Sequence, residues 1–335
     1  MNSEIKVYII DEPFEHSDME ILGLPVKEYA VKALQELEPV FASRADIKGG
    51  GNIAVIYTDT PLVTVNAIKS IIGILEEQNI DSMALGRGYV SRAGIIDKNP
   101  AVNYGGEESI RVSAATLPDI YRAISMRNVD TAIRNGAIIL DKTAVYIDCG
   151  AVIEEGAIIY PMVSVKGTSV IRKGAIIRSG SVIENSVIKG GANILASFIN
   201  DSVIGENTTV GPCSYVRGGS EIGNNVRIGD FVEVKASKLG DGCKAAHLTY
   251  IGDAELGISV NVGCGTVFAN YNGKIKQKTY VGDFAFIGSN TNLVAPLKVG
   301  NYAYTAAGST VTEDVPDNTL CIARARQVIK ERKDR

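Results

Sequence analysis

Two histidines are the side chains of this chain whose chemistry is most useful at neutral pH. His16 lies in the acidic segment IIDEPFEHSD, and His247 lies in AAHLTY. An imidazole near its ordinary pKa can act as a general base, but a histidine packed on a turn is also commonly structural. From the residue alone, both roles of His247 therefore stay open.

The cysteines point away from disulfide, zinc or redox chemistry. Their number is odd, and they form neither a CxxC pair nor a zinc-site spacing: Cys149, Cys213, Cys243, Cys264 and Cys321. The opening segment MNSEIKVYIIDEPF lacks the charged and apolar regions of a secretory signal. We therefore expect reduced thiols in a cytoplasmic protein.

A six-residue repeat must position any such chemistry. Aliphatic residues recur in three runs: Ile147, Ile153, Ile159, Val165, Ile171, Ile177, Ile183; Ile204, Val210, Val216, Ile222, Ile228, Val234; and Val281, Ile287, Leu293, Val299, a lapse at Thr305, and Val311. Smaller residues precede the first run by two positions: Ala151, Ala157, Val163, Ser169, Ala175 and Ser181. This period fits neither an α-helix nor an isolated amphipathic strand.

The repeat predicts a parallel β-helix, in which three units of strand and turn close one triangular coil. The aliphatic residue fills the interior, and the smaller residue relieves crowding beside it. The phase slips between Ile183 and Ile204 and again over VFANYNGKIKQKT. The second interruption is too polar for the interior, so we expect a protruding loop there.

The remaining segments differ from the repeat. Residues 1–112 are expected to form a small parallel α/β domain, with strands in KVYIID and NIAVIYTD and helices in PVKEYAVKALQEL and TVNAIKSIIGILEEQ. Residues 113–140 are expected to form one or two linker helices, and Gly136 ends that segment. The β-helix takes residues 141–318, or roughly nine to ten coils, and a basic tail follows at 319–335.

Composition excludes several classes of partner. The net charge of −4 gives no reason to expect nucleic acid or an anionic membrane surface as the main partner. No apolar run reaches the roughly 18 residues of a membrane span.

The segment from Ile228 to Gln327 resembles the acetyltransferase half of the bifunctional bacterial enzymes that make UDP-N-acetylglucosamine. The resemblance rests on IGDFVEVKASKLGDGCKAAHLTYIGDAELG, VNVGCGT, ANYNGK, FIGSNTNLVAP, AAGSTVTEDVP and IARARQ, in the family's order. RNVDTAIRNGAIILD resembles the family's linker. The resemblance implies a left-handed β-helix that transfers acetyl from acetyl-CoA to the amine of glucosamine 1-phosphate, a step toward cell-wall precursors.

The resemblance also assigns roles to individual residues. His247 matches the general base, and Asn270 matches a residue near the reacting amine, whose amide either orients the amine or polarises the thioester. The sugar or its phosphate is assigned to Arg217, Lys235, Tyr250, Asn261 and Lys276. The acetyl-CoA groove is assigned to Cys264, Tyr271, Ser289, Ala307 and Arg324. Cys264 stands where the family often has alanine, but direct transfer needs no covalent cysteine.

One departure leaves the acceptor open. The family usually has RPG where this chain has Arg217-Gly218-Gly219, and glycine loosens that loop. Another amino-sugar phosphate or a nucleotide-amino sugar is therefore an alternative acceptor, and a non-catalytic trimeric scaffold is a further alternative. One prism has flat faces, and the resemblance implies that chains assemble as a homotrimer whose sites are shared between them. It also implies that the loop at Lys276 reaches a neighbouring subunit.

The first domain resembles the family's nucleotidyltransferase half only in fragments. MEILGLPVKEYAVKAL and NIAVIYTDTPLVT match, and the second places Asp59 at a metal-binding position. The Gly-rich loop that would hold a triphosphate is replaced by IIDEPFEHSD, which has no glycine and would repel phosphates. We therefore expect that uridylyl transfer is lost and that Mg²⁺ is an unlikely cofactor, because a lone aspartate is a poor Mg²⁺ site.

Overall fold

In the computed structural model, described for residues 5–96 and 99–331, the chain divides into two compact units, Met1–Asn128 and Val129–Arg335. The boundary lies inside the helix α3 (Leu117–Arg134). This helix occupies most of the segment in which linker helices were expected. Gly136 follows it with a φ of 92°, a left-handed conformation that suits glycine at a helix end.

The first unit contains a five-stranded mixed sheet in the order β4-β1-β5-β7-β6. Its strands are β1 (Ile5–Ile10), β4 (Val40–Phe41), β5 (Asn52–Tyr57), β6 (Ser82–Leu85) and β7 (Gly88–Ser91). β1 pairs in parallel with β4 and β5, whereas β7 is antiparallel to both β5 and β6. The expectation of a parallel sheet is therefore wrong for the β6–β7 hairpin, which has the two-residue turn Gly86-Arg87.

The two faces of this sheet are covered differently. On one face, α2 (Val65–Glu77) begins at Thr64, whose Oγ1 accepts from Ala67 N at 3.1 Å, and its apolar residues join the core of β1 and β5. On the other face, Tyr8, Tyr57 and Tyr89 form a smaller cluster with β-strand aliphatic residues. The unit's other elements are β2 (Glu20–Ile21), β3 (Leu24–Pro25), α1 (Glu28–Ala33), η1 (Gln35–Leu37) and η2 (Glu107–Ser109).

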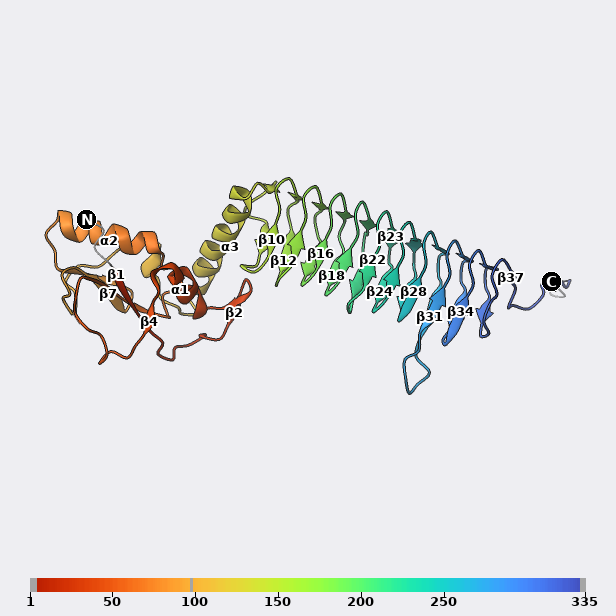
Figure 1. Cartoon of the computed structure of the whole chain (residues 1–335), viewed down its shortest axis with the longest axis horizontal. Coiled ribbons are helices and arrows are strands. Elements are labelled where there is room, and N and C mark those ends of the chain that lie inside the picture. The colour runs from red at the N-terminus through yellow and green to blue at the C-terminus, as the bar shows by residue number, and fades with distance from the viewer. Residues whose placement is uncertain (1–4, 97–98, 332–335) are drawn as a thin grey trace. The chain divides into compact units, whose positions relative to one another are not determined.

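The second unit is a parallel β-helix with three walls (Figure 1). In the three walls, strands pair in parallel with the strand three places along the chain, as expected when three strands make one coil, except that β35 pairs with β37 at the end of one wall. The predicted fold class, a β-rich left-handed parallel β-helix behind a small α/β domain, is confirmed.

The strand bounds of the three walls follow. The first wall contains β10 (Val152–Ile153), β13 (Val170–Ile171), β16 (Val187–Ile188), β19 (Val203–Ile204), β22 (Glu221–Ile222), β25 (Lys238–Leu239), β28 (Ala254–Leu256), β31 (Thr279–Val281) and β34 (Leu297–Val299).

The second wall contains β8 (Ile138–Ile139), β11 (Ile158–Ile159), β14 (Ile176–Ile177), β17 (Asn193–Ile194), β20 (Thr209–Val210), β23 (Arg227–Asp230), β26 (Lys244–His247), β29 (Asn261–Val262), β32 (Phe286–Ile287), β35 (Tyr304–Thr305) and β37 (Leu320–Cys321).

The third wall contains β9 (Val145–Ile147), β12 (Val163–Lys166), β15 (Val182–Glu184), β18 (Phe198–Asn200), β21 (Tyr215–Arg217), β24 (Glu233–Lys235), β27 (Tyr250–Gly252), β30 (Val267–Ala269), β33 (Asn292–Val294) and β36 (Thr310–Val311).

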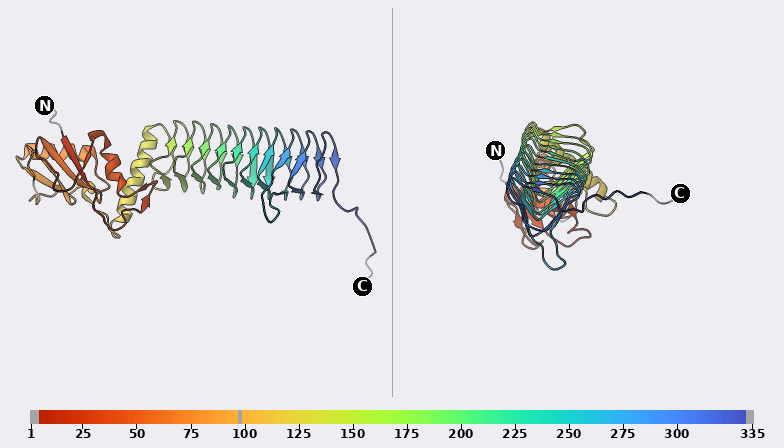
Figure 2. Two further views of the ribbon diagram at one scale, coloured as in Figure 1. Left: turned by 60° about the horizontal axis from the view of Figure 1, so that its bottom comes forward. Right: turned by 90° about the vertical axis from the view of Figure 1, so that its right-hand side faces the viewer.

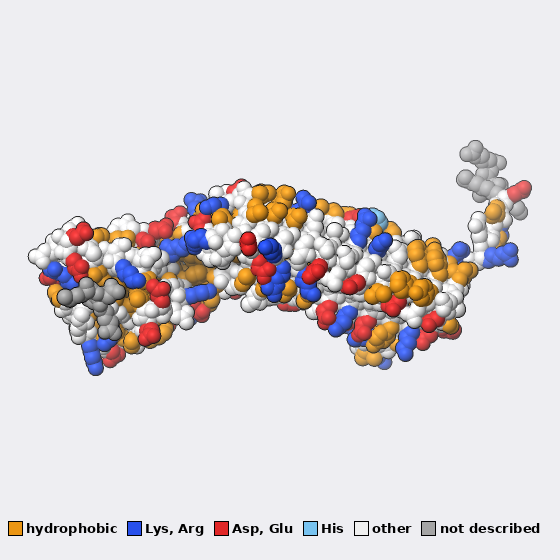
Figure 3. All heavy atoms as spheres, turned by 45° about the horizontal axis from the view of Figure 1, so that its top comes forward, with side chains coloured by type: hydrophobic (Ala, Val, Ile, Leu, Met, Phe, Trp, Pro, Cys, Tyr) orange, Lys and Arg blue, Asp and Glu red, His pale blue; other side chains and the backbone are white. Residues whose placement is uncertain are grey.

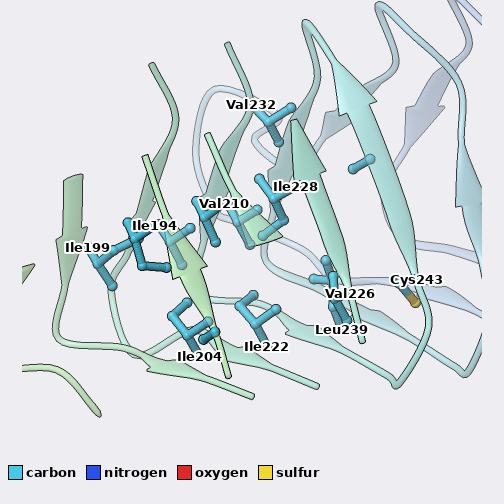
Figure 4. Packing of buried hydrophobic residues seen from close by; sticks show 14 of the residues in the cluster. Ile194, Ile199, Ile204, Val210, Ile222, Val226, Ile228, Val232, Leu239 and Cys243 are labelled. Carbon is cyan, nitrogen blue, oxygen red and sulfur yellow. The ribbon is translucent and has the colours of Figure 1, made fainter. Parts of the chain in front are cut away.

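The interior of the coil is filled by the residues that the repeat singled out. All of the predicted aliphatic positions are buried, and so is Thr305. Figure 4 shows successive aliphatic side chains pointing into the space between the walls. The stacking survives the phase slip, because Ile171 pairs with Ile188 and Ile188 with Ile204. The slip therefore shortens corners and leaves the ladder intact.

The smaller residues also have a bonding role that the sequence did not indicate. Ser169 Oγ accepts from Ser186 N at 3.2 Å, and Ser186 Oγ accepts from Ser202 N at 3.0 Å. All three serines are buried. The hydroxyls of Ser169 and Ser186 thus satisfy amides of the next coil at a place where water is excluded.

Two segments leave the coil, as Figures 1 and 2 show. The loop between β30 and β31 protrudes, as its polar sequence predicted. After β37 the described chain runs away from the coil. Of the helices in the described ranges, none has both the length and the apolar character that crossing a bilayer requires.

Candidate active site

His247 and Asp230 lie side by side on the second wall. β23 and β26 are four residues long, whereas the other described strands of this wall have two. The additional residues carry each strand toward the corner, where Asp230 pairs with His247 in register. Strand length therefore positions this pair.

The pair is joined by a hydrogen bond. His247 Nδ1 lies 2.6 Å from Asp230 Oδ1. Because a carboxylate only accepts, Nδ1 carries the proton, and Nε2 keeps its lone pair with no partner among the described residues. The hydrogen bond from His247 is the main cause that lowers the pKa of Asp230. The arrangement gives a fixed tautomer with a basic nitrogen, and the His247 side chain is 52% exposed.

Gly229 allows the two coils to approach at this point. A Cβ on Gly229 would overlap the carbonyl oxygen of Ala246 on the next coil. Gly229 also accepts, through its own carbonyl, from the buried Ser214 hydroxyl. The residue immediately before Asp230 therefore tolerates no side chain without moving the wall.

Three predicted acetyl-CoA residues form a column above His247. On this wall Lys244 pairs with Asn261, Asn261 pairs with Phe286, and Phe286 pairs with Tyr304. The residues three positions later are stacked in the same order, and they are His247, Cys264, Ser289 and Ala307. At about 4.8 Å per coil, the column spans roughly 14 Å. Arg324 lies beside its far end, with Cδ 3.7 Å from the position of a Cβ on Gly308.

Two predicted phosphate residues are adjacent on the third wall. Arg217 in β21 pairs in register with Lys235 in β24, so their side chains lie on one surface. The guanidinium of Arg217 is already engaged, because Nη2 and Nε lie 2.6 and 3.0 Å from Glu233 Oε1. Arg217 also lies over the Tyr215 ring, 5.3 Å from its centroid. These contacts hold Arg217 against the wall.

Lys276 on the protruding loop lies next to Lys235 of the same chain. The side-chain hydrogen bond with Lys235 is the main cause that lowers the pKa of Lys276, and the like charge of Lys235 adds to it. The loop that presents Lys276 is held by Asn272, whose Oδ1 accepts from Lys274 N and Ile275 N at 3.0 Å each. Two facing ammonium groups on an exposed surface form a site that favours an anion.

Tyr250 and Asn270 complete this cluster. Asn270 is buried, and its Nδ2 donates to an oxygen of Asp253 and to Tyr250 Oη, the latter at 3.4 Å. Gly252 leaves the space that the Tyr250 phenol occupies, because a Cβ there would overlap it. We call Arg217, Lys235, Tyr250, Asn270 and Lys276 the third-wall cluster.

Of the other two predicted residues, one lies apart from this cluster and one lies at its edge. Asn261 is on the second wall, in register between Lys244 and Phe286. Tyr271 is exposed on the loop, where it forms an isolated antiparallel bridge with Lys276. In the described part of the chain, no hydrogen bond connects His247 to the third-wall cluster.

Three acidic residues of the site were not predicted. They are Asp230, Glu233 and Asp253, which hold His247, Arg217 and Asn270 respectively. Each acidic residue is separated from its partner by 16 or 17 positions in the sequence. That separation is one coil, so a search for acidic residues one coil away from each candidate would have found them.

Asp59 does not have the surroundings of a metal ligand. Its Oδ2 lies 3.0 Å from Arg111 Nε and 3.8 Å from Arg87 Nη1, so two cations already face it. Within the described residues, no group of three or more metal-ligating side chains is present. The residues around Asp59 therefore do not fit Mg²⁺, which prefers several oxygen ligands.

The chain is similar in sequence to several known proteins. The bifunctional protein GlmU of Clostridium acetobutylicum is 44% identical over 270 residues, which are 79% of this chain and 59% of that protein. GlmU of Clostridioides difficile is 55% identical over 197 residues, 59% of this chain and 43% of the relative. The chain is a homologue of GlmU. It spans about half the length of these GlmU relatives.

The other comparisons are with a family model and with solved structures. The family model described as the GMPPB C-terminal domain matches residues 142–240. The crystal structure of Francisella novicida UDP-N-acetylglucosamine acyltransferase is 20% identical and covers 55% of this chain and 66% of its own, with a TM-score of 0.40. The Arabidopsis UDP-N-acetylglucosamine acyltransferase is 17% identical over 55% of this chain and 69% of its own, with a TM-score of 0.34.

Proposed function

We propose that this GlmU homologue transfers the acetyl group of acetyl-CoA to the amine of glucosamine 1-phosphate. The observation that carries the proposal is the Asp230–His247 pair, which leaves a basic nitrogen exposed beside the column of Cys264, Ser289 and Ala307. A base next to an extended row of residues suits acyl transfer from a long carrier to an amine.

The reaction needs one proton to move. The amine nitrogen attacks the thioester carbonyl while His247 Nε2 removes a proton from that nitrogen. The C–N bond forms and the C–S bond breaks. The imidazolium then returns the proton to the departing thiolate of CoA. Asp230 keeps the ring oriented and stabilises the imidazolium, as a carboxylate does for a catalytic histidine.

The hydrogen bonds of Asn270 favour a role in orienting the amine over a role in polarising the thioester. Both hydrogens of its Nδ2 are engaged by Asp253 and Tyr250, and a flipped amide would place its oxygen against the Asp253 carboxylate. Only Oδ1 remains for a substrate, and a carbonyl oxygen accepts hydrogen bonds. It is suited to an amine N–H and unsuited to the oxyanion of the transition state.

The third-wall cluster is proposed to hold the sugar 1-phosphate. Lys235 and Lys276 repel one another without a ligand, and a dianionic phosphate between them would reverse that repulsion. Arg217 is held beside them by Glu233. Planar guanidinium and point-like ammonium groups together suit a phosphate.

The active assembly is proposed to be a homotrimer. The catalytic base and the third-wall cluster lie on two walls of one prism, so a neighbouring chain would bring a base and a cluster together. Exposed apolar side chains on the coil support such packing, among them Phe198, Phe231 and Leu248. Figure 3 shows hydrophobic side chains gathered on the coil surface near its C-terminal end.

Uridylyl transfer is proposed to be lost. Arg87 and Arg111 face the carboxylate of Asp59, and the segment after β1 is acidic where a phosphate-binding loop would be needed. The expected result is no pyrophosphate release from UTP and N-acetylglucosamine 1-phosphate with Mg²⁺ present. Measurable release would contradict this part of the proposal.

The decisive experiment follows CoA release with a thiol reagent. Wild-type protein with acetyl-CoA and glucosamine 1-phosphate is expected to release CoA, and His247→Ala should lower kcat by about 10²–10⁴-fold. Lys244→Ala, which changes an exposed residue of the same strand, serves as the control. Glucosamine without phosphate tests the acceptor, and nucleotide-amino sugars test the alternative.

The outcomes separate the rival functions. Release with a different amino sugar only would move the proposal to that acceptor. No release with any of them would leave a non-catalytic scaffold. Equal rates for wild type and His247→Ala would remove His247 from its role while leaving the activity.

A further inference from the structure

A small cavity lies against the sheet face of the first unit that α2 does not cover. Its volume is about 180 Å³, and its walls come from aliphatic and tyrosine side chains of β1, β5 and β7 together with Ile47 and Ile96. At about 30 Å³ per molecule, it would hold roughly six waters. Nucleotide-sized ligands usually need about 300 Å³ or more, so the cavity fits a small molecule with a single ring.

Two arginines supply the charge of this cavity. Arg87 comes from the β6–β7 turn and lies 4.4 Å from the centroid of the Tyr57 ring, and Arg44 lies 5.3 Å from the same centroid. Both arginines line the cavity, and no acidic side chain is among its described lining residues. A cavity with cationic and apolar walls favours a ligand that combines a negative group with an apolar body.

Glu12 shows how these arginines hold a carboxylate. Arg44 Nε and Nη2 lie 3.1 and 3.3 Å from Glu12 Oε1 and Oε2, and Arg87 Nη2 also contacts Oε2. Glu12 comes from the segment after β1, and its side chain is 36% exposed. It is therefore a carboxylate at the rim that can turn out to solvent and release both guanidinium groups.

The other charges around the arginines are accounted for. Arg87 also faces Asp59, at 3.8 Å, and Asp59 is shared with Arg111. Asp59 Oδ1 is buried without a hydrogen-bond partner among the described atoms. Three guanidinium groups therefore face two carboxylates, which leaves one positive charge in excess before a ligand binds.

We propose that this cavity binds a small molecule that carries a planar carboxylate on a single apolar ring, with the ligand's carboxylate replacing Glu12 between Arg44 and Arg87. The ring lies between the aliphatic wall and Tyr57. This site is independent of the acetyl-transfer proposal, because all of its residues belong to the first unit. It gives that unit a ligand-binding role.

The test measures benzoate binding to the full chain by saturation-transfer NMR and calorimetry. Benzoate is expected to bind wild type, and neutral benzamide is expected to bind much more weakly. Arg44→Gln should weaken benzoate binding about tenfold, since a bidentate charged contact is removed. Glu12→Gln should tighten it, because the competing internal carboxylate loses its charge. Arg92→Gln, an arginine of the same unit bonded to Asn79 and Asp81, is the control.

Several results would overturn the proposal. They are the absence of benzoate binding to both wild type and Glu12→Gln, equal binding of benzoate and benzamide, and benzoate binding that Arg44→Gln leaves unchanged. Phenyl phosphate binding without benzoate binding would overturn the carboxylate assignment. Circular dichroism and thermal melting establish that each variant is folded, and Arg44→Lys should restore part of the affinity if charge is what matters.

Discussion

At the scale of single residues, the site depends on charges that are held by neighbours one coil away. Asp230 fixes the tautomer of His247, Glu233 holds Arg217, and Asp253 holds the amide of Asn270. Three of the candidates that the sequence supplied therefore have an acidic partner that the sequence did not indicate. A homologous motif names the residue that touches substrate, whereas its supporting partner becomes visible only when the coils are stacked.

Asp230→Asn is expected to lower kcat by roughly 10²–10⁴-fold, because the amide can present either end to Nδ1 and no longer fixes the useful tautomer. Acetyl-CoA and sugar KM values should change little, since Asp230 lies behind the base. Steady-state kinetics on both variants, Asp230→Asn and Asp230→Glu, check this. An unchanged kcat in Asp230→Asn would show that the pair is structural.

The lowered pKa of Asp230 also has a sign for stability. A carboxyl group whose folded pKa lies below its unfolded value stabilises the fold at pH values above the unfolded pKa. That contribution is lost as the pH falls through the folded pKa, which lies below the ordinary pKa of an aspartate. Urea unfolding of wild type and Asp230→Asn should therefore differ near neutral pH and converge in acid. A difference that grows toward low pH would contradict this interpretation.

Lys276→Met is expected to separate binding from stability. Lys276 has a lowered pKa because Lys235 faces it, so the charged form is disfavoured in the fold, and this penalty disappears only as the pH rises through the folded pKa. Removing the charge should leave the free energy of unfolding at neutral pH unchanged or higher. The KM for glucosamine 1-phosphate should rise about tenfold or more. Lys274→Met, on the same loop, is the matched control, and equal KM effects of both would reject a specific phosphate contact.

At the scale of elements, strand length and corner length decide where chemistry lies. The six-residue period predicted the interior of the β-helix well, because burial of one aliphatic residue per unit is a local requirement. It did not predict that β23 and β26 are longer than their neighbours, since nothing in the inward pattern records where a strand stops. In the first unit the β6–β7 hairpin was also missed. The turn Gly86-Arg87 lies in MALGRGYV, whose short apolar runs were not interpreted as strands.

Gly229→Ala tests the close approach of β23 and β26. The added methyl group would overlap the Ala246 carbonyl, so the wall must move, and the expected cost is about 1–3 kcal/mol. The kcat for CoA release should fall even under conditions in which the variant remains folded, because the Asp230–His247 distance changes when the wall moves. The same exchange at Gly73 in α2, where a Cβ meets open space, should be neutral or stabilising. Chemical denaturation and CoA release measure both effects, and a fully active Gly229→Ala variant would contradict the argument.

At the scale of the whole molecule, the two units carry separate proposals. The acetyl-transfer residues all lie after residue 128, and the arginine cavity lies before it. A chain of residues 129–335 contains the whole β-helix core, including Val129 and Ala132 of α3. It is expected to keep the kcat and KM of the full chain within about twofold, provided that the proposed trimer forms. Light scattering and CoA-release kinetics on both chains check this, and an inactive but folded, trimeric 129–335 chain would contradict it.

The two ends of the β-helix are finished differently. At its beginning, Val129 and Ala132 of α3 pack into the core and cap the first coil. At its far end, β37 is followed by the departing tail, and Leu320 is 59% exposed. Because each coil is bonded only to its neighbours, thermal opening should travel inward from the unsealed end. The coils beside Ala307 and Arg324 would then unfold before those beside His247. Mild heating would therefore disrupt the proposed acetyl-CoA-binding residues while the catalytic base keeps its position.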